Sequence, residues 1–487
     1  MKKFITVIIS LIMVLMCLTA CQNSNNGNTS NTTDLKSGSW TGTIGDKEVT
    51  LTGAYLIDGE EVTLTEGEYE STTGDENVFL VVNGGKLTIK NSKITKTGES
   101  DNDSKSPSES TTQKNDQNNE SAGSNENSNE QPPEPPKDEN GNPMKPENNN
   151  EQDDSNGQPP ELPSNSNGDT NKPDGEPPEK SSDNNPSSNN MQAPPQGGEN
   201  SNEDAYNFYG KNSAIVCVGE GSSIIIEDCE ITTDAEGSNA VFSTAGATID
   251  VNNITINTSK NSSRGLYSTY GGSVTAKNVN IATKGSHCAN LATDRGGGSV
   301  AVSGENNTFK TEGEGSPIVY STGDISVENG TGTSAISETV VIEGLNKINL
   351  ENCDFTSDSE KYAIMLYQST SGDATDEDSS NGSEGCSSLI MKNSKITYNG
   401  KGEIFHITNT ITDVNMDNVE FNDCDTFISA GADRWGQENK NGGTLTMSVN
   451  NMKISGKVIA DDISKITLNI GKKAINNTET EGSVEVN

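Results

Sequence analysis

Residues 249–256, Ile-Asp-Val-Asn-Asn-Ile-Thr-Ile, decide the fold. Apolar side chains at 249 and 251 alternate with polar ones, which is the period of a strand with one buried face. Asn253 then interrupts the alternation, and asparagine tolerates the left-handed backbone of a tight corner better than other non-glycine residues. Another apolar residue, Ile256, follows three positions later. The stretch therefore predicts a strand, a corner and the start of a second strand.

The same pattern, apolar-x-apolar-x-Asn-x-x-(Ile/Phe), returns along most of the chain. From 228 onward, where Asp replaces Asn, successive corner positions are 25, 25, 28, 23, 23, 41, 25 and 33 residues apart. A short apolar strand precedes each copy. A base period of about 24 residues is one coil of a solenoid with several short strands per turn. The copies are centred on Asn91, Asp228, Asn253, Asn278, Asn306, Asn329, Asn352, Asn393, Asn418 and Asn451.

Coils of this length and irregular spacing predict an all-β fold, a right-handed parallel β-helix. A left-handed β-helix keeps a stricter, hexapeptide repeat. In its stacked corner asparagines the chain resembles the pectin-lyase-like superfamily of parallel β-helices. It is also similar to clostridial-type surface proteins described as adhesins or carbohydrate-binding. The resemblance covers the repeat-bearing part of the chain and implies an architecture rather than an activity.

The N-terminus has the pattern of an export signal. Lys2 and Lys3 precede an apolar run at 4–16 that is short for a membrane span. Residues 18–21, Leu-Thr-Ala-Cys, resemble the lipobox of bacterial lipoproteins. That resemblance implies removal of residues 1–20, acylation of Cys21, and a protein held at the outer face of the cell membrane. The alternative is an ordinary secretory signal followed by a chance cysteine.

Two segments lack the repeat. Residues 21–37 are rich in Asn, Ser, Thr and Gly, which predicts a flexible tether. Residues 99–204 contain 16 of the 17 prolines among polar residues. Such a composition buries too little apolar surface to offset chain entropy, so we expect a disordered insertion. It is interpreted as a spacer, a segment threading the cell wall, or an insertion without a binding role.

The insertion is expected to loop out from one continuous solenoid. The pentapeptide Asn-Ser-Lys-Ile-Thr occurs at 91–95 and again at 393–397. Residues 38–98 should therefore belong to the same solenoid as residues 205–487. We expect residues 38–70, with Trp40, to cap one end and residues 458–487 to form the other, because open strand edges invite aggregation.

Charge and cysteine usage narrow the partners. The net charge of −39 argues against nucleic acid and anionic lipid surfaces as ligands. The cysteines beyond Cys21 show no CxxC spacing and are too sparse for a disulfide framework, so we expect buried apolar side chains. We expect no cofactor and a monomer.

The longest insertions between repeats, at 293–298, 368–387 and 430–443, fall at one turn of the coil. Stacking should place them along one edge of the solenoid, where binding residues are expected. An exposed indole there could stack on a sugar ring while Arg and Asp hold its hydroxyls. The alternative is local Asp–Arg salt bridges with the indole packed onto the solenoid. The predicted edge comprises Tyr270, Asp294, Arg295, Asp433, Arg434 and Trp435.

Metal sites are weakly indicated. The acidic stretch with Asp373, Asp376 and Asp378 has the oxygen ligands that Ca²⁺ prefers, but it lacks the EF-hand pattern and fits a solvated loop. The two histidines, His287 and His406, are interpreted as structural because neither has a second ligand nearby in the sequence. No metal site is therefore predicted.

The leading functional hypothesis is a lipid-anchored adhesin or glycan-binding protein. A polysaccharide lyase or glycoside hydrolase is the alternative, although the Gly-His-Gly and Arg-x-Lys motifs of polygalacturonases are absent from the sequence. The least implausible lyase set is Asp294 and Arg295 with the acidic stretch at 371–384. A structural spacer is the third possibility. A binder predicts exposed aromatics along the edge, and an enzyme predicts convergent acids with a basic residue.

Overall fold

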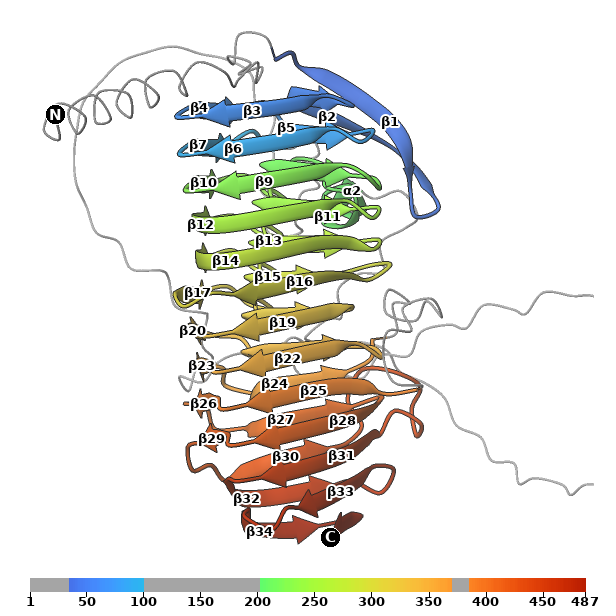
Figure 1. Cartoon of the computed structure of the whole chain (residues 1–487). Coiled ribbons are helices and arrows are strands. Elements are labelled where there is room, and N and C mark those ends of the chain that lie inside the picture. The colour runs from blue at the N-terminus through green and yellow to red at the C-terminus, as the bar shows by residue number, and fades with distance from the viewer. Residues whose placement is uncertain (1–34, 100–201, 370–384) are drawn as a thin grey trace, which may run out of the picture. The chain divides into compact units, whose positions relative to one another are not determined.

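The computed structural model describes residues 35–99, 202–369 and 385–487, with backbone alone for residues 202–204. In these segments parallel strands stack into a right-handed β-solenoid of about 12 turns (Figure 1). The expected all-β, parallel β-helical fold is confirmed. The predicted signal peptide and tether up to residue 34, the lipid site Cys21, and the calcium candidates Asp373, Asp376 and Asp378 lie outside the described residues.

Each turn contributes one strand to a 14-stranded sheet, called here the first sheet. All its neighbours pair in parallel except β1 and β2, which form an antiparallel hairpin. Its strands, in order along the solenoid, are β1 (Gly38–Ile44), β2 (Lys47–Asp58), β5 (Glu76–Val82), β8 (Ile215–Val218), β11 (Val241–Thr244), β13 (Leu266–Thr269), β15 (Leu291–Thr293), β18 (Val319–Ser321), β21 (Val340–Glu343), β24 (Tyr362–Tyr367), β27 (Glu403–Thr408), β30 (Thr426–Ala430), β32 (Lys453–Ala460) and β34 (Ile475–Glu481).

The rest of each turn belongs to a second, 21-stranded sheet with two rows. The first row is β3 (Glu61–Thr65), β6 (Lys86–Lys90), β9 (Ser223–Glu227), β12 (Thr248–Thr258), β14 (Gly272–Thr283), β16 (Gly298–Ser303), β19 (Asp324–Glu328), β22 (Lys347–Glu351), β25 (Ser387–Lys392), β28 (Thr410–Asp417), β31 (Gly443–Asn450), β33 (Lys465–Ile470) and β35 (Val484–Val486). The second row adds β4 (Glu68–Ser71), β7 (Lys93–Lys96), β10 (Glu230–Thr233), β17 (Asn307–Thr311), β20 (Gly330–Ser334), β23 (Asp354–Ser357), β26 (Lys395–Tyr398) and β29 (Glu420–Phe421). Strands β12 and β14 run through both rows.

The two rows meet at the corner asparagines, which adopt the predicted left-handed conformation. Asn253 and Asn418 have φ of 54° and 55°. Their side chains bond from coil to coil: Asn418 Nδ2 donates to Asn393 Oδ1 at 2.9 Å, and Asn352 Nδ2 donates to Asn329 Oδ1 at 3.1 Å. Each asparagine therefore serves its own corner and also links it to the next coil.

One corner differs from the sequence prediction. Val300 pairs with Val274 and Val302 with Ala276, so the repeat in this coil starts two residues earlier than the pattern centred on Asn306. The left-handed corner residue is Gly304, with φ 95°. Glycine occupies this conformation without strain, and a Cβ there would lie 2.7 Å from Asn278 Oδ1. The pattern failed here because it required asparagine.

The solenoid continues across the long insertion. Strand β7 pairs with β10, with Lys93 opposite Glu230, and β6 pairs with β9. The first sheet does the same, with Phe79 opposite Ile215. Residues 38–98 and 205–487 thus share one stack, as the repeated pentapeptide predicts. The helix α2 (Asn202–Phe208) begins inside the predicted insertion, whose last three residues, 202–204, are helical.

The N-terminal hairpin, β1 and β2, is shorter than the cap at residues 38–70 expected from the sequence. Residues 61–71 already form strands of the first coil, β3 and β4. The β1–β2 hairpin covers the outside of the first sheet together with α2, and its Ile44 shares an apolar cluster with Phe208, Phe242 and Tyr267. Trp40 Nε1 donates to Asn83 Oδ1 at 3.2 Å. The first sheet therefore buries apolar side chains on both faces over its N-terminal coils.

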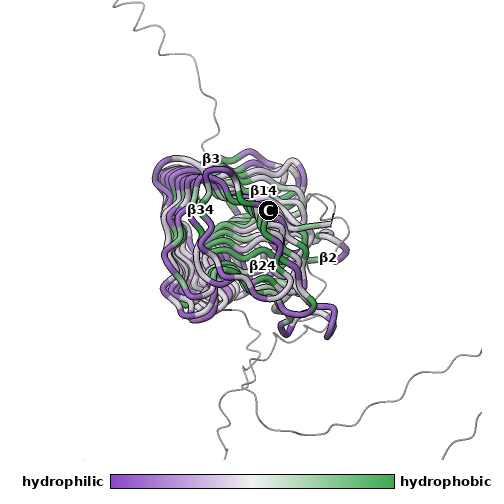
Figure 2. The backbone as a smooth tube through the Cα atoms, turned by 90° about the horizontal axis from the view of Figure 1, so that it is seen from below, coloured by the Kyte–Doolittle hydropathy of each residue, from purple (hydrophilic) through white to green (hydrophobic). Residues whose placement is uncertain are grey.

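The interior is one continuous apolar core that runs from Ile57 to Leu468. Viewed along the axis, apolar segments line the inside and hydrophilic turns lie at the corners (Figure 2). The cysteines of the described segments are unpaired and, apart from the half-buried Cys424, fully buried, as expected for small apolar residues. No helix within the described segments is long and apolar enough to span a membrane.

Candidate functional site

The outward side chains of the first sheet form a continuous column. Parallel pairing places Tyr267, Ala292, Tyr320, Val341, Met365 and His406 next to one another on successive coils. The opposite face of these strands supplies the core. The turns after β15 and β30 lie beside this outward, partly aromatic surface, and these two turns carry the Asp-Arg pairs of the sequence.

The first pair, Asp294 and Arg295, follows β15. Asp294 is 8% exposed. Its Oδ1 accepts from the backbone N–H of Arg295 at 2.8 Å, and its Oδ2 accepts from the Tyr267 hydroxyl at 3.1 Å. The Arg295 guanidinium lies over the Phe208 ring of α2, 3.9 Å from its centroid. The aspartate therefore fastens the turn to the column, and the arginine stacks on an aromatic ring.

A second arginine, Arg264, contacts the tyrosine that bonds this pair. Arg264 lies 4.7 Å from the centroid of the Tyr267 ring, and its Nη1 donates to Asn207 Oδ1 at 2.9 Å. The Tyr267 hydroxyl shares its single hydrogen between Asp294 and the Asn207 carbonyl, which lies 2.7 Å away. Burial raises the pKa of Tyr267 well above its usual value. The phenol thus remains a neutral donor to Asp294 at any ordinary pH.

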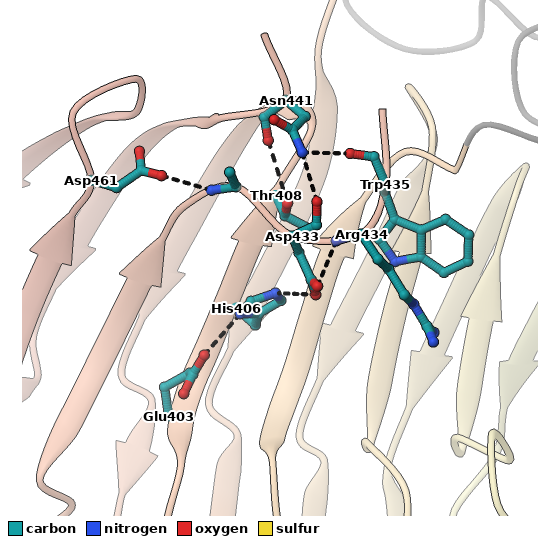
Figure 3. A network of polar contacts seen from close by, with 9 residues as sticks. Glu403, His406, Thr408, Asp433, Arg434, Trp435, Asn441 and Asp461 are labelled. Carbon is teal, nitrogen blue, oxygen red and sulfur yellow. Dashed lines mark hydrogen bonds and ion pairs between the residues drawn. The ribbon is translucent and has the colours of Figure 1, made fainter. Parts of the chain in front are cut away.

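The second pair, Asp433 and Arg434, follows β30 and repeats the arrangement (Figure 3). Asp433 Oδ1 accepts from the Arg434 backbone N–H at 2.6 Å, and Oδ2 lies 3.4 Å from His406 Nε2. The Arg434 guanidinium lies over the Trp435 ring, 4.5 Å from its centroid. In both pairs the aspartate contacts a member of the outward column and the arginine stacks on an aromatic ring.

His406 is the charged member of the column. Its Nδ1 lies 2.8 Å from Glu403 Oε1, and its ring stacks on Tyr362 with centroids 4.4 Å apart and planes 9° apart. Burial alone would lower the pKa of His406, but the contacts with Asp433 and Glu403 and the charges of both carboxylates raise it to about 9. The contact with His406 in turn lowers the pKa of Asp433 to about 2. The three side chains form an imidazolium flanked by two carboxylates.

The loop that carries Asp433 is internally braced. Asn441 Nδ2 donates to the carbonyl oxygens of Asp433 at 2.6 Å and Trp435 at 2.8 Å, so one amide spans the loop (Figure 3). The Ala432 N–H donates to Asp461 Oδ2 of the next coil at 2.7 Å. The 431–442 loop is therefore a compact unit docked on the first sheet.

The predicted exposure of Trp435 is wrong. The indole is 8% exposed and packs against Tyr367, with ring centroids 5.2 Å apart, in a cluster with Val341 and Met365. The sequence alternative, an indole packed onto the solenoid, is correct on this point. The apolar outward column offers Trp435 a surface to bury, and nothing in its own loop indicates this. Arg434 remains exposed above it.

Tyr270 is brought to the covered part of the first sheet. Its ring stacks on Tyr209 next to α2, with centroids 5.8 Å apart and planes 8° apart. The hairpin turn at Gly45 packs against the same ring. Tyr270 is therefore half-buried by local packing, and the structure groups it with Phe208 and Tyr209. The predicted edge thus divides into a covered part and an Arg434-bearing part.

Sequence reasoning missed a polar group between the two Asp-Arg pairs. The buried Glu343 accepts hydrogen bonds from the Tyr320 hydroxyl and, at 2.8 Å, from the Tyr367 hydroxyl. Burial raises the pKa of both phenols well above the usual value. The only available signal was Tyr320 in β18 and Tyr367 in β24. Alternation alone would assign these residues to the core.

The geometry does not suit a metal ion. Glu403 and Asp433 contact different nitrogens of His406, so the three groups do not converge on one point. Throughout the described ranges, no three His, Cys, Asp or Glu side chains are grouped as metal ligands. His287 lies at a corner with φ 57°, which is a backbone role.

Comparison with known proteins leaves the chain unassigned. No family model, no curated protein and no solved structure matches it. The fold and its surface therefore carry the functional argument.

Proposed function

We propose that this chain is a lipid-anchored surface protein whose solenoid binds an extended glycan along the outside of its first sheet. The repeated Asp-Arg unit carries the proposal. Both units occupy the same turn, share the same backbone bond, and stack their arginines on aromatic rings. A fold that needs only apolar alternation does not require this repetition, whereas a ligand with a repeating structure would exploit it.

The spacing of the two units fits a polymeric ligand. Five coil steps separate β15 from β30, which is about 24 Å at the usual strand spacing. Guanidinium groups donate several hydrogen bonds in a fixed plane, and stacking on a ring restricts their motion before binding. One extended chain lying along the solenoid could contact both arginines at its hydroxyl or acidic groups.

A glycan array with the purified protein lacking residues 1–21 tests this. Arg295→Ala and Arg434→Ala should each weaken binding about tenfold or more, the loss of one charge-assisted contact. Lys440→Ala, in the same loop but away from the Asp-Arg unit, is the control and should bind normally. Unchanged binding in the double arginine variant would place the site elsewhere. Release of sugars from a bound polysaccharide would favour the lyase or hydrolase alternative, and silence in both assays the spacer.

The anchor rests on the lipobox-like residues 18–21 and has its own test. Cys21→Ala should remove the acylation site, so the protein should move from the membrane fraction to the soluble or secreted fraction. Metabolic labelling with an alkyne fatty acid should mark the wild type alone. Membrane retention of the unlabelled variant would contradict the proposal.

A further inference from the structure

The two Asp-Arg units differ in the group that fastens them. Asp294 is held by the Tyr267 phenol, which is neutral. Asp433 is held by His406, whose ring is shared with Glu403. Only the second fastening depends on a proton that can be lost within the range of stability of a folded protein. The first unit is thus a built-in control for the second.

We propose that His406 is a pH-operated latch that holds the 431–442 loop, with Arg434 and Trp435, on the first sheet and releases it when the imidazolium loses its proton. The geometry gives the reason. A doubly protonated ring carries an N–H on both nitrogens: Nδ1 hydrogen-bonds Glu403, and Nε2 forms a 3.4 Å ion pair with Asp433. A neutral ring keeps one proton, and the shorter contact, 2.8 Å to Glu403, retains it at Nδ1.

Deprotonation then turns an attraction into a repulsion at the loop. The lone pair of Nε2 then faces Asp433 Oδ2 at 3.4 Å, so the ion pair is lost and two acceptors face each other. The charge that neutralised the two carboxylates is also gone. Glu403 lies on the same strand as His406, so it stays, whereas Asp433 belongs to the loop and is more exposed. Release therefore moves the loop.

Other groups around the ring do not replace the lost charge. The face of His406 is covered by Tyr362 of β24, a phenol whose pKa is raised by burial and by the charges of Glu338, Asp433 and Glu403. Its neighbour on β30 is Ser429, which does not titrate. From the loop, Arg434 points its guanidinium over Trp435. The pKa of about 9 for His406 sets the expected midpoint.

The loop should move as a unit that includes the indole. Asn441 bonds the carbonyls of both Asp433 and Trp435, so displacement of the aspartate pulls on the backbone of the tryptophan. Trp435 lies against Tyr367 in the closed state. Since Trp40 is the one other tryptophan, a Trp40→Phe protein has a single indole that reports the latch.

The experiment measures indole emission and acrylamide quenching in the Trp40→Phe protein from pH 6 to 10. The emission should shift to the red and quenching should rise several-fold, with a midpoint near the pKa of 9 for His406. His406→Leu, which offers neither a charge nor a hydrogen-bond donor, should show the open signal already at pH 7. Asp433→Asn should stay closed throughout, because its amide can donate to a neutral ring. Circular dichroism on the same samples confirms that the solenoid remains folded.

Two results would overturn the latch: an indole signal of the Trp40→Phe protein that is flat to pH 10, or His406→Leu closed at pH 7. If His406→Leu fails to fold, Asp433→Asn with its predicted loss of the transition decides. A histidine NMR titration, assigned with His287→Asn, must give the same midpoint. The effect on glycan affinity rests on the proposed function, but the indole signal needs no ligand. A working latch without glycan binding therefore refutes only the proposed function.

Discussion

Single residues set the corners of this solenoid. Asn393 and Asn418 combine φ near 50° with an amide that bonds the neighbouring coil, and Asp228 does the same with a carboxylate that accepts from Asn253. Where the ladder uses Gly304, the conformation is kept and Asn329 Nδ2 donates to its carbonyl at 2.7 Å instead. The asparagine repeat was therefore a sound basis for predicting most corners, but it missed Gly304 and also Glu66, which has φ 56° at the corner between β3 and β4.

The His406 contacts predict how stability depends on pH. The pKa of His406 is raised from 6.5 to about 9 in the fold, so its contribution is complete below pH 6.5 and is lost as the pH rises through 9. The pKa of Asp433 is lowered from 3.8 to about 2, so its contribution is complete above 3.8 and is lost as the pH falls through 2. A shift of this size in His406 corresponds to about 3 kcal/mol.

Thermal unfolding of wild type and His406→Gln at a series of pH values checks this. The difference in midpoint should be largest on the plateau between the two unfolded-state values and should shrink on both sides. His287→Gln, at a corner, should show no such plateau. A difference between wild type and His406→Gln that stays constant from pH 5 to 10 would rule out the ion-pair contribution.

The candidate site itself could be predicted only in part at this scale. The Asp-Arg repetition is visible in the sequence, and both pairs do lie at one turn. The partner of Asp433 is not visible, because His406 lies on the preceding coil within an apolar strand. Which side chains meet across coils depends on the register and on whether a residue points in or out, and a one-residue change reverses that.

At the scale of elements, the long insertion is an addition to its coil and takes the place of no residue of the repeat. The strand registers pair Lys96 with Thr233 and Ile215 with Val241, and counting on from them sets Glu99 beside Glu236 and Lys211 beside Gly237. Joining Glu99 directly to Lys211 would therefore give a corner of the same length as that in the next coil. The buried Lys96 fixes the backbone just before the insertion: its Nζ donates to the carbonyls of Thr73 at 2.8 Å and Gly98 at 2.9 Å.

Two deletion variants distinguish the contribution of the insertion to stability from that of α2. Replacing residues 100–201 by a flexible Gly/Ser linker keeps α2 and should slightly raise stability, by about 0.6 kcal/mol for each halving of the loop. Joining Glu99 to Lys211 also removes α2, which uncovers Phe242 and Tyr267 and loses the buried Phe208 and Tyr209. That variant should be less stable by several kcal/mol, about 1.5–3 for each buried side chain.

Thermal midpoints and binding of a hydrophobic dye compare the two variants. The linker variant should match the wild type in dye binding, and the direct fusion should bind more. Equal stability of both would mean that α2 does not protect the first sheet. This cover was beyond sequence prediction, because its docking site is formed by strands that follow it in the chain.

For the molecule as a whole, stability should decline toward the C-terminal coil. Strands β12 and β14 have partners on both sides and bury one face completely. Strand β34 pairs only with β32, and its side chains are almost all exposed. Hydrogen exchange should therefore be fastest in β34 and slowest in β12 and β14. Protection of β34 equal to that of β12 would show that another element or partner covers this edge.

The overall fold was the part best predicted from sequence. Alternation defines the buried face of each strand, and a period near 24 residues leaves few architectures other than stacked coils. The continuity of the solenoid across the insertion also followed from local sequence, because Asn91 and Asn393 begin the same pentapeptide. The outward column had no such signal, since its residues alternate with core residues that look alike.

Regular stacking also fixes distances along the solenoid in multiples of one coil spacing. The distance between Asp294 and Asp433 is counted in whole coils, because strand pairing allows no intermediate value. Removing residues 319–339 would bring Val340 beside Leu291, in the place that Val319 holds now. The two Asp-Arg units would then approach by one strand spacing, about 4.8 Å. Gaining or losing a coil between the units would thus change the length of the glycan that we propose they bind, one increment at a time, without altering either unit.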